Sequence, residues 1–325
     1  DVIRVLERNC RSIVGTLRKA NKWFYVEPMQ ASFKHDVMVP GKGGARLGDR
    51  VLVNLNDWED PRLSPGGKIV DVIGPANDPS LDTLAVIKAF NLPETFPPQV
   101  VEQAQSARIP KKEIERRQDL RKKFIFTIDP EDAKDFDDAI SLEKARDGNW
   151  RLGVHIADVS YFVSRDSELD REATKRGTSV YLPDTVIPML PEQLSNGLCS
   201  LRPDEDRLAF SVFMTINEEG EILRTSFAET VICSQLRLTY EQALSALGGD
   251  QKAIAAVPGL AKRVALLQQV NTVARALRRL RFSTGALEMH IPEVKFKIGA
   301  DGRIADIILS TTDEAHQLIE ECMLA

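Results

Sequence analysis

Residues 127–140 read TIDPEDAKDFDDAI, and this stretch places six carboxylates within ten positions. It lies directly between two apolar segments, 124–128 and 139–142. Carboxylates gathered beside buried strands repel one another, and their pKa values rise unless cations neutralise them. The donors are oxygen only, which is typical of Mg²⁺ or Mn²⁺ sites, and the spacing does not fit an EF-hand. The stretch therefore predicts a site for a hard divalent cation, and a solvated acidic turn is the alternative.

Strands and helices are mixed without regular alternation around this acidic stretch. That pattern indicates an α+β domain over residues 124–325. Two Mg²⁺ ions about 4 Å apart in such a domain would form a phosphoryl-transfer site, in which one ion activates a water and the other stabilises the leaving oxygen. The expected strands are 124–128, 150–157, 208–216 and 224–233, and the expected helices are 168–176, 191–196, 240–247, 257–280 and 312–325.

The segment 1–75 consists of short β-rich runs separated by Gly and Pro turns. Strands are expected at 2–6, 12–17, 23–26, 36–39, 50–53 and 68–72. This number of strands in so short a segment favours an all-β barrel of the oligonucleotide-binding (OB) type. The aromatic run 23–25 places alternate rings on opposite faces of a strand. One face would fill the barrel, and the other would either stack on bases or pack against neighbouring strands.

Charge is segregated along the 325-residue chain, whose formal net charge is −5. Residues 1–128 carry 21 Lys and Arg against 16 Asp and Glu, whereas residues 129–325 carry 22 against 32. The segment 76–123 reads as a loop-rich linker that ends in a basic helical connector, with eight basic residues over 108–123. This stretch would either attract a polyanion or form a solvated face between the domains. No membrane helix is expected, and four cysteines without a C-x-x-C pair favour reduced thiols in a cytoplasmic protein.

The sequence resembles the family of ribonuclease II and ribonuclease R exoribonucleases. The acidic stretch matches the signature of that family, and further motifs follow it in the same order. These motifs are long and collinear, and the segment before them resembles a cold-shock domain, so the resemblance covers essentially the whole chain. The further motifs are 154–161 (VHIADVSY), 176–183 (RGTSVYLP), 187–191 (IPMLP), 194–201 (LSNGLCSL), 237–240 (RLTY) and 316–325 (HQLIEECMLA).

The resemblance implies roles for the aspartates of the acidic stretch. The four aspartates of the family motif fall on Asp129, Asp135, Asp137 and Asp138. In the family these residues hold Mg²⁺, and the third is the one most closely tied to cleavage. We therefore expect Asp137 to be catalytic as well as a metal ligand.

The resemblance also implies residues that contact RNA. The family tyrosine that stacks on a base matches Tyr181, and Tyr240 and Glu320 match residues that contact ribose hydroxyls. A contact to the 2′-hydroxyl is how such an enzyme prefers RNA to DNA. The sequence departs from the family at Met289, where many relatives carry an aromatic residue, so this wall of the base clamp offers no π face to a base.

The family's catalytic domain is longer than the part matched here, because the chain stops at Ala325 within a family helix. An arginine-rich segment and a C-terminal RNA-binding domain would follow. The catalytic domain is therefore expected to be incomplete, and full activity from this chain alone is not expected.

Two hypotheses follow from these observations. The first is a monomeric 3′-to-5′ exoribonuclease that hydrolyses single-stranded RNA to 5′-mononucleotides by two-metal chemistry. The alternative is a catalytically incomplete fragment that binds RNA without turnover. A ladder of shortened products distinguishes the enzyme from the binding module.

Overall fold

The computed structural model describes residues 11–58, 60, 62–288, 293–299, 303–310 and 312–325. The chain divides into two compact units. The described residues of the first unit fall within 11–95, 179–187 and 294–308, and those of the second within 96–178, 188–293 and 309–325. Each unit is described by itself below. The strand expected at 2–6 lies outside the described residues.

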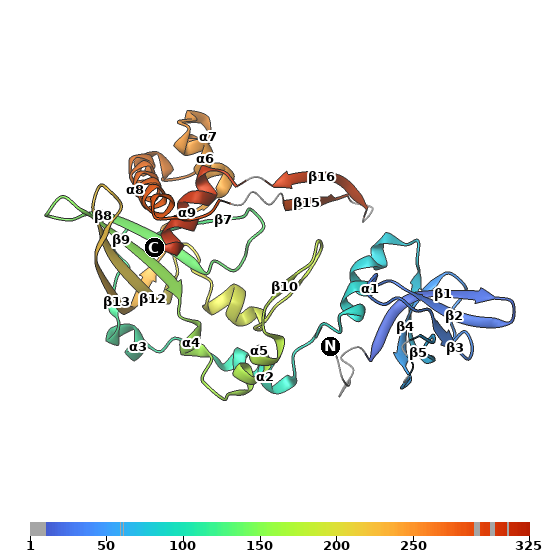
Figure 1. The fold of residues 1–325 in the computed structure, drawn as a ribbon. Helices are drawn as coiled ribbons and strands as arrows, with labels where there is room; N and C mark the ends of the chain where they lie inside the picture. The colour runs from blue at the N-terminus through green and yellow to red at the C-terminus, as the bar shows by residue number, and fades with distance from the viewer. Residues whose placement is uncertain (1–10, 59, 61, 289–292, 300–302, 311) are drawn as a thin grey trace. The chain divides into compact units, whose positions relative to one another are not determined.

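The first unit is built on a five-stranded antiparallel sheet in the order β3-β2-β1-β4-β5 (Figure 1). A bridge between Met38 and Gly66 links the two outer strands, so the sheet curls into a barrel. Its interior is lined by buried aliphatic side chains such as Ile13, Leu17 and Val26. The strands are β1 (Ser12–Ala20), β2 (Trp23–Pro28), β3 (Val37–Val39), β4 (Asp49–Leu55) and β5 (Gly67–Pro75).

Short elements complete the first unit. Pro79 opens a 3₁₀ turn at a position where proline costs no hydrogen bond, and α1 follows directly. A small hairpin from later in the chain, and most of a second one, also belong to this unit. These elements are η1 (Pro79–Leu81), α1 (Asp82–Ala89), β10 (Val180–Tyr181) with β11 (Val186–Ile187), and β15 (Glu293–Ile298) with β16 (Ile304–Ser310).

The second unit contains a seven-stranded mixed sheet in the order β14-β7-β8-β9-β12-β13-β6. The central strands pair antiparallel, whereas β14 and β6 join the two edges in parallel. This arrangement is the α+β domain that the sequence predicts. The strands are β6 (Gln118–Asp119), β7 (Phe126–Asp129), β8 (Asp138–Lys144), β9 (Trp150–Ala157), β12 (Asp206–Ile216), β13 (Ile222–Cys233) and β14 (Leu236–Thr239).

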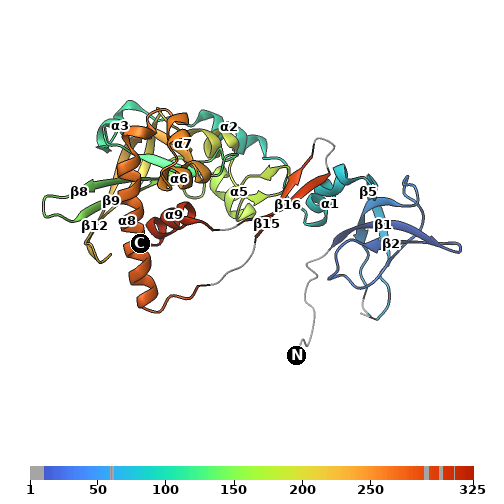
Figure 2. The same ribbon diagram turned by 90° about the horizontal axis from the view of Figure 1, so that it is seen from above.

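Helices cover both faces of this sheet, and each face has its own hydrophobic cluster (Figure 1). One cluster joins the sheet to α6–α9, and the other joins it to α2, α4, α5 and η2. Figure 2 shows α8 and α9 side by side. The helices are α2 (Pro98–Ser106), α3 (Lys111–Arg116), α4 (Val159–Phe162), α5 (Glu168–Arg176), the π-type η2 (Gln193–Leu198), α6 (Tyr240–Leu247), α7 (Gln251–Ala256), η3 (Leu260–Lys262), α8 (Val264–Ser283) and α9 (Glu314–Leu324).

Two expectations from the sequence differ from the structure. The helix expected over 257–280 begins only at Val264, because Pro258 and the left-handed Gly259 (φ +82°) interrupt it. The segment 99–123 is more than a connector, since Val100 and Leu120 are buried in the core of the second unit. None of the helices in the described ranges combines the length and the apolar run that a membrane crossing needs.

Candidate active site

The acidic stretch forms the connection between two neighbouring strands of the second unit. Asp129 is the last residue of β7, and Asp138 is the first residue of β8, which pairs antiparallel with β7. Asp135 and Asp137 lie in the loop between them. On the other side of β7, Thr239 pairs with Asp129. The two strand ends therefore bring carboxylates that are nine positions apart in sequence to the same edge of the sheet.

Asp129, Asp137 and Asp138 have raised pKa values. Burial raises the pKa of Asp129 to about 6, and the charges of Asp138 and Asp135 add to this shift while Arg237 opposes it. Burial also raises the pKa of Asp137 to about 6, with further contributions from Asp135 and Asp138, although this side chain stays open to solvent. Burial alone raises the pKa of Asp138. The raised pKa values of Asp129 and Asp137 thus reflect burial first and the charges of neighbouring aspartates second.

The donor chemistry of this group fits a hard divalent cation. Asp129 is only 7% exposed, and its Oδ2 atom has no hydrogen-bond partner. A buried carboxylate oxygen without a partner is costly unless a cation or a water approaches it. Within the described ranges, however, no group of three or more His, Cys, Asp or Glu side chains has the geometry of a metal site. The loop therefore gathers suitable ligands without presenting them in a closed arrangement.

Tyr240 lies beside the aspartates, at the first position of α6. Burial raises the pKa of its phenol to about 12, and the charges of Asp138 and Asp129 contribute. Its ring stacks on that of His316, with centroids 3.9 Å apart and an interplanar angle of 9°. His316 Nδ1 is 2.8 Å from Asp313 Oδ1. The pair His316 and Asp313 was missed by the sequence analysis, although His316 opens the last of the family motifs.

The other predicted RNA-contacting residues are more scattered. Glu320 is exposed on α9, 3.3 Å from Arg281, and the neighbouring Glu321 is buried against the same arginine at 2.5 Å. Tyr181 belongs to the β10–β11 hairpin of the first unit and is 65% exposed, so it is not part of the unit that holds the aspartates. Met289 lies outside the described residues.

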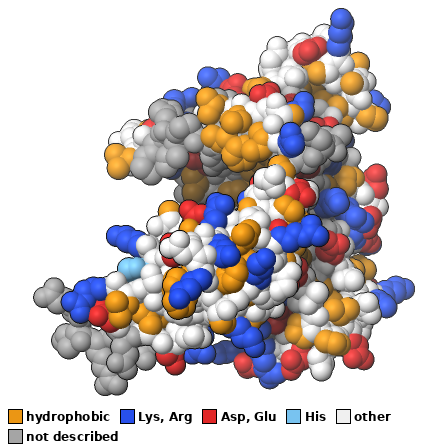
Figure 3. All heavy atoms as spheres, turned by 90° about the vertical axis from the view of Figure 1, so that its right-hand side faces the viewer, with side chains coloured by type: hydrophobic (Ala, Val, Ile, Leu, Met, Phe, Trp, Pro, Cys, Tyr) orange, Lys and Arg blue, Asp and Glu red, His pale blue; other side chains and the backbone are white. Residues whose placement is uncertain are grey.

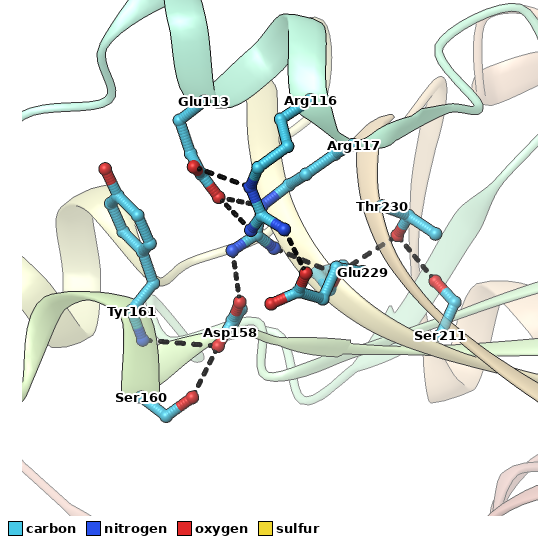
Figure 4. Close-up of polar contacts among 10 residues, drawn as sticks. Glu113, Arg116, Arg117, Asp158, Ser160, Tyr161, Ser211, Glu229 and Thr230 are labelled. Carbon is cyan, nitrogen blue, oxygen red and sulfur yellow. Dashed lines mark hydrogen bonds and ion pairs between the residues drawn. The ribbon is translucent and has the colours of Figure 1, made fainter.

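The basic stretch 108–123 is largely neutralised by carboxylates. Arg117 is buried and its side chain contacts Asp158 at 2.6 Å and Glu113 at 2.7 Å, and Arg116 bridges Glu113 and Glu229 (Figure 4). Further pairs join Lys111 to Glu115, Arg121 to Asp119 and Asp206, and Lys123 to Glu143. Some of these carboxylates lie within the stretch, and others, such as Glu143, Asp206 and Glu229, come from distant strands. That the stretch attracts a polyanion stays a prediction.

Comparison with known proteins supports the resemblance seen in the sequence. The family model of the RNB domain matches residues 117–325, and that of the cold shock domain matches residues 25–97. Ribonuclease R of Thermotoga maritima is 42% identical over 330 residues, which cover 99% of this chain and 46% of that protein. The chain thus spans less than half the length of this curated relative.

Solved structures share the fold. RNase R of Mycoplasma genitalium in complex with double-stranded RNA has a TM-score of 0.86 and 24% identity, covering 99% of this chain and 57% of that one. Yeast Ssd1, described as a pseudonuclease, has a TM-score of 0.70 and 20% identity, covering 86% of this chain and 35% of that one. The predicted fold class, a cold-shock barrel followed by an α+β domain, is confirmed. Because the RNB model alone matches more than half of its residues, this chain belongs to the family of ribonuclease II and ribonuclease R.

Proposed function

We propose that the acidic loop is the active site of a 3′-to-5′ exoribonuclease that hydrolyses single-stranded RNA to 5′-mononucleotides. The observation that carries this proposal is the buried Oδ2 of Asp129, which has no hydrogen-bond partner and lies near aspartates whose charges raise the pKa of Asp129. Membership in the ribonuclease II and ribonuclease R family supports it. The proposed enzyme has two parts, the barrel of residues 1–75 and the catalytic domain of residues 124–325. The segment 98–123 packs against the catalytic domain and belongs with it.

The proposed chemistry divides among the aspartates of the loop. Asp129, Asp135, Asp137 and Asp138 would hold the divalent cations, Mg²⁺ or Mn²⁺. When bound, these ions would offset the charge on the phosphate and on the attacking and leaving oxygens. Asp137, which is open to solvent, accepts a hydrogen bond from the attacking water and orients it. The bond from phosphorus to the 3′-oxygen of the penultimate nucleotide breaks, which leaves a new 3′-hydroxyl and a released 5′-mononucleotide.

The proposed RNA contacts use residues around the loop and on the barrel. Tyr240, beside the aspartates, and Glu320 contact ribose hydroxyls, and the exposed Tyr181 stacks on a base. On β2, Trp23 is 60% exposed with Lys22 5.9 Å from its ring. Figure 3 looks onto the first unit, where Lys and Arg side chains are spread among apolar ones. Such a mixture of aromatic rings and cations suits binding of single strands without sequence preference.

The test is degradation of 5′-labelled single-stranded RNA with Mg²⁺ by this chain and by its Asp137→Asn variant, with RNA binding measured in parallel. We expect a ladder of shortened products that falls by about 100-fold or more in the variant while binding persists, because orientation of the water is lost. An unchanged ladder in the variant would contradict the role of Asp137. Binding without a ladder in either protein would favour the alternative, an RNA-binding module without turnover. The fold permits that outcome, since Ssd1 is described as a pseudonuclease.

A further inference from the structure

Arg237 holds the beginning of the acidic loop by its backbone. This residue lies on the edge strand β14, and its guanidinium donates hydrogen bonds to the carbonyl oxygens of Pro130 at 2.5 Å and Glu131 at 2.9 Å. The same guanidinium lies 5.4 Å from the ring centroid of Phe136, at the far side of the loop. One planar, multiply donating group thus ties two consecutive peptide units and faces a buried ring of the same loop.

Ser200 holds the middle of the acidic loop. Its hydroxyl, which is fully buried, donates to the carbonyl oxygen of Lys134 at 2.8 Å and accepts from the N–H of Phe136 at 3.1 Å. The next residue, Leu201, donates its N–H to the carbonyl oxygen of Phe136 at 2.8 Å. Arg207 in turn donates to the carbonyl oxygen of Ser200 at 2.7 Å, so the serine itself is fixed.

These contacts bracket the aspartates without ending on their side chains. The ties at 130, 131, 134 and 136 fall between Asp129 and Asp137, and those of Ser200 flank Asp135 on both sides. A further tie, from the N–H of Ala157 to the carbonyl oxygen of Asp137 at 2.9 Å, holds the end of the loop on β9. The hydrogen bonds end on peptide groups, so they fix the directions in which the carboxylates leave the backbone.

We propose that Arg237 and Ser200 are positioning residues that hold the acidic loop in the conformation that binds divalent cations. They come from the motifs 237–240 and 194–201, which the sequence analysis noted without giving these two residues a role. The proposal deepens the proposed function and rests on it. Residues that orient metal ligands from outside typically change metal affinity by about 10- to 100-fold when they are replaced.

Three variants and one matched control test this proposal in the full 325-residue chain. Ser200→Ala removes the hydroxyl, and Arg237→Gln removes the charged guanidinium. Arg237→Lys keeps the charge but replaces the planar guanidinium, whose Nη2 donates to both carbonyl oxygens, with an ammonium on a shorter side chain. The control is Ser211→Ala, which also removes a buried serine hydroxyl. That hydroxyl contacts His155 at 2.7 Å and Thr230 at 2.6 Å, within the sheet rather than at the loop.

The first measurement is Mn²⁺ affinity, read from the loss of the free-ion electron paramagnetic resonance signal. We expect about 10- to 100-fold weaker binding for Ser200→Ala and Arg237→Gln, an intermediate loss for Arg237→Lys, and a change of less than about twofold for Ser211→Ala. Thermal melts without metal show whether each variant is folded. The second measurement is backbone hydrogen exchange without metal, which should become faster over 130–138 in the three variants and stay unchanged there in the control.

Each alternative outcome is distinct. Unchanged Mn²⁺ affinity in folded Ser200→Ala and Arg237→Gln proteins would overturn the positioning role and leave the proposed function standing. An equal loss of affinity in Ser211→Ala would also overturn it, because a general loss of stability would then explain the effect. No Mn²⁺ binding by the unchanged chain would overturn the metal site itself, and the positioning role with it.

Discussion

At the scale of single residues, burial moves the pKa values of different side chains in opposite directions. Desolvation disfavours the charged form, so it raises the pKa of Asp129 and Asp137 but lowers the pKa of His155 to about 3. His155 is fully buried, with Ser141 Oγ 3.0 Å from its Nε2 and Ser211 Oγ 2.7 Å from its Nδ1. A neutral imidazole between two hydroxyls is satisfied there, because one ring nitrogen donates and the other accepts.

The burial of neutral His155 therefore predicts that the folded chain becomes less stable in acid. Above pH 6.5 the imidazole is neutral in both the folded and the unfolded chain, so it adds no pH dependence to the free energy of unfolding. Below that pH the unfolded chain binds a proton that the folded chain excludes, so the free energy of unfolding falls by about 1.4 kcal/mol per pH unit, or about 2 kcal/mol at pH 5. The fall continues until pH approaches 3, the folded-state value.

Urea unfolding of the chain and of His155→Gln between pH 8 and pH 5 checks this prediction. The variant should lose this part of the pH dependence. Asp129 and Asp137 change the free energy of unfolding in the opposite sense, because their raised pKa values let the metal-free folded chain take up protons near pH 6. The His155→Gln variant keeps both aspartates, so this contribution is the same in the two proteins. An equal pH dependence in both proteins would show that His155 is not held neutral.

At the scale of elements, one turn of the large sheet packs against the backbone of the longest helix. Gly220, in the turn between β12 and β13, has φ +92°, and a Cβ atom there would lie 2.6 Å from the carbonyl carbon and oxygen of Ala276 in α8. Neither backbone segment can yield easily. The close approach and the positive φ together explain why position 220 needs glycine.

Gly220→Ala is expected to lower the free energy of unfolding by about 2–4 kcal/mol, from the positive φ and the clash together. The matched control is Gly148→Ala, in the turn between β8 and β9, where φ is +88° but no atom lies within 4 Å of the added Cβ. The control should cost only the conformational part, about 1–2 kcal/mol. Equal losses in urea titrations of the two variants would show that the contact with α8 contributes nothing.

At the scale of the whole molecule, each compact unit has its own hydrophobic core. Val26 lies in the barrel core of the first unit, whereas Leu267 of α8 lies in the core of the second. We therefore expect two calorimetric unfolding transitions. Val26→Ala should lower the midpoint temperature of one transition and Leu267→Ala that of the other, because each cavity lowers the free energy of unfolding of its unit by about 2–4 kcal/mol. A single transition that moves with both variants would show that the two cores unfold together.

The sequence by itself was sufficient for the family, the fold class and most of the elements. Strands such as 12–17 and 208–216 and helices such as 168–176 follow from local patterns of side chains, and the acidic motif is contiguous. Such features depend on neighbours within a few positions, so they can be predicted from the sequence alone.

Only the tertiary structure decided which distant groups meet. It pairs Arg117 with Asp158 across 41 positions, brings Ser200 and Arg237 onto the loop that precedes them by about 65 and 107 positions, and assigns Tyr181 to a different unit from the aspartates. The same holds for the raised pKa of Asp129, which depends on burial by elements far along the chain. The physical reason is that ion pairing and desolvation depend on distance in space, and strand pairing makes distant residues neighbours without leaving a local pattern in the sequence.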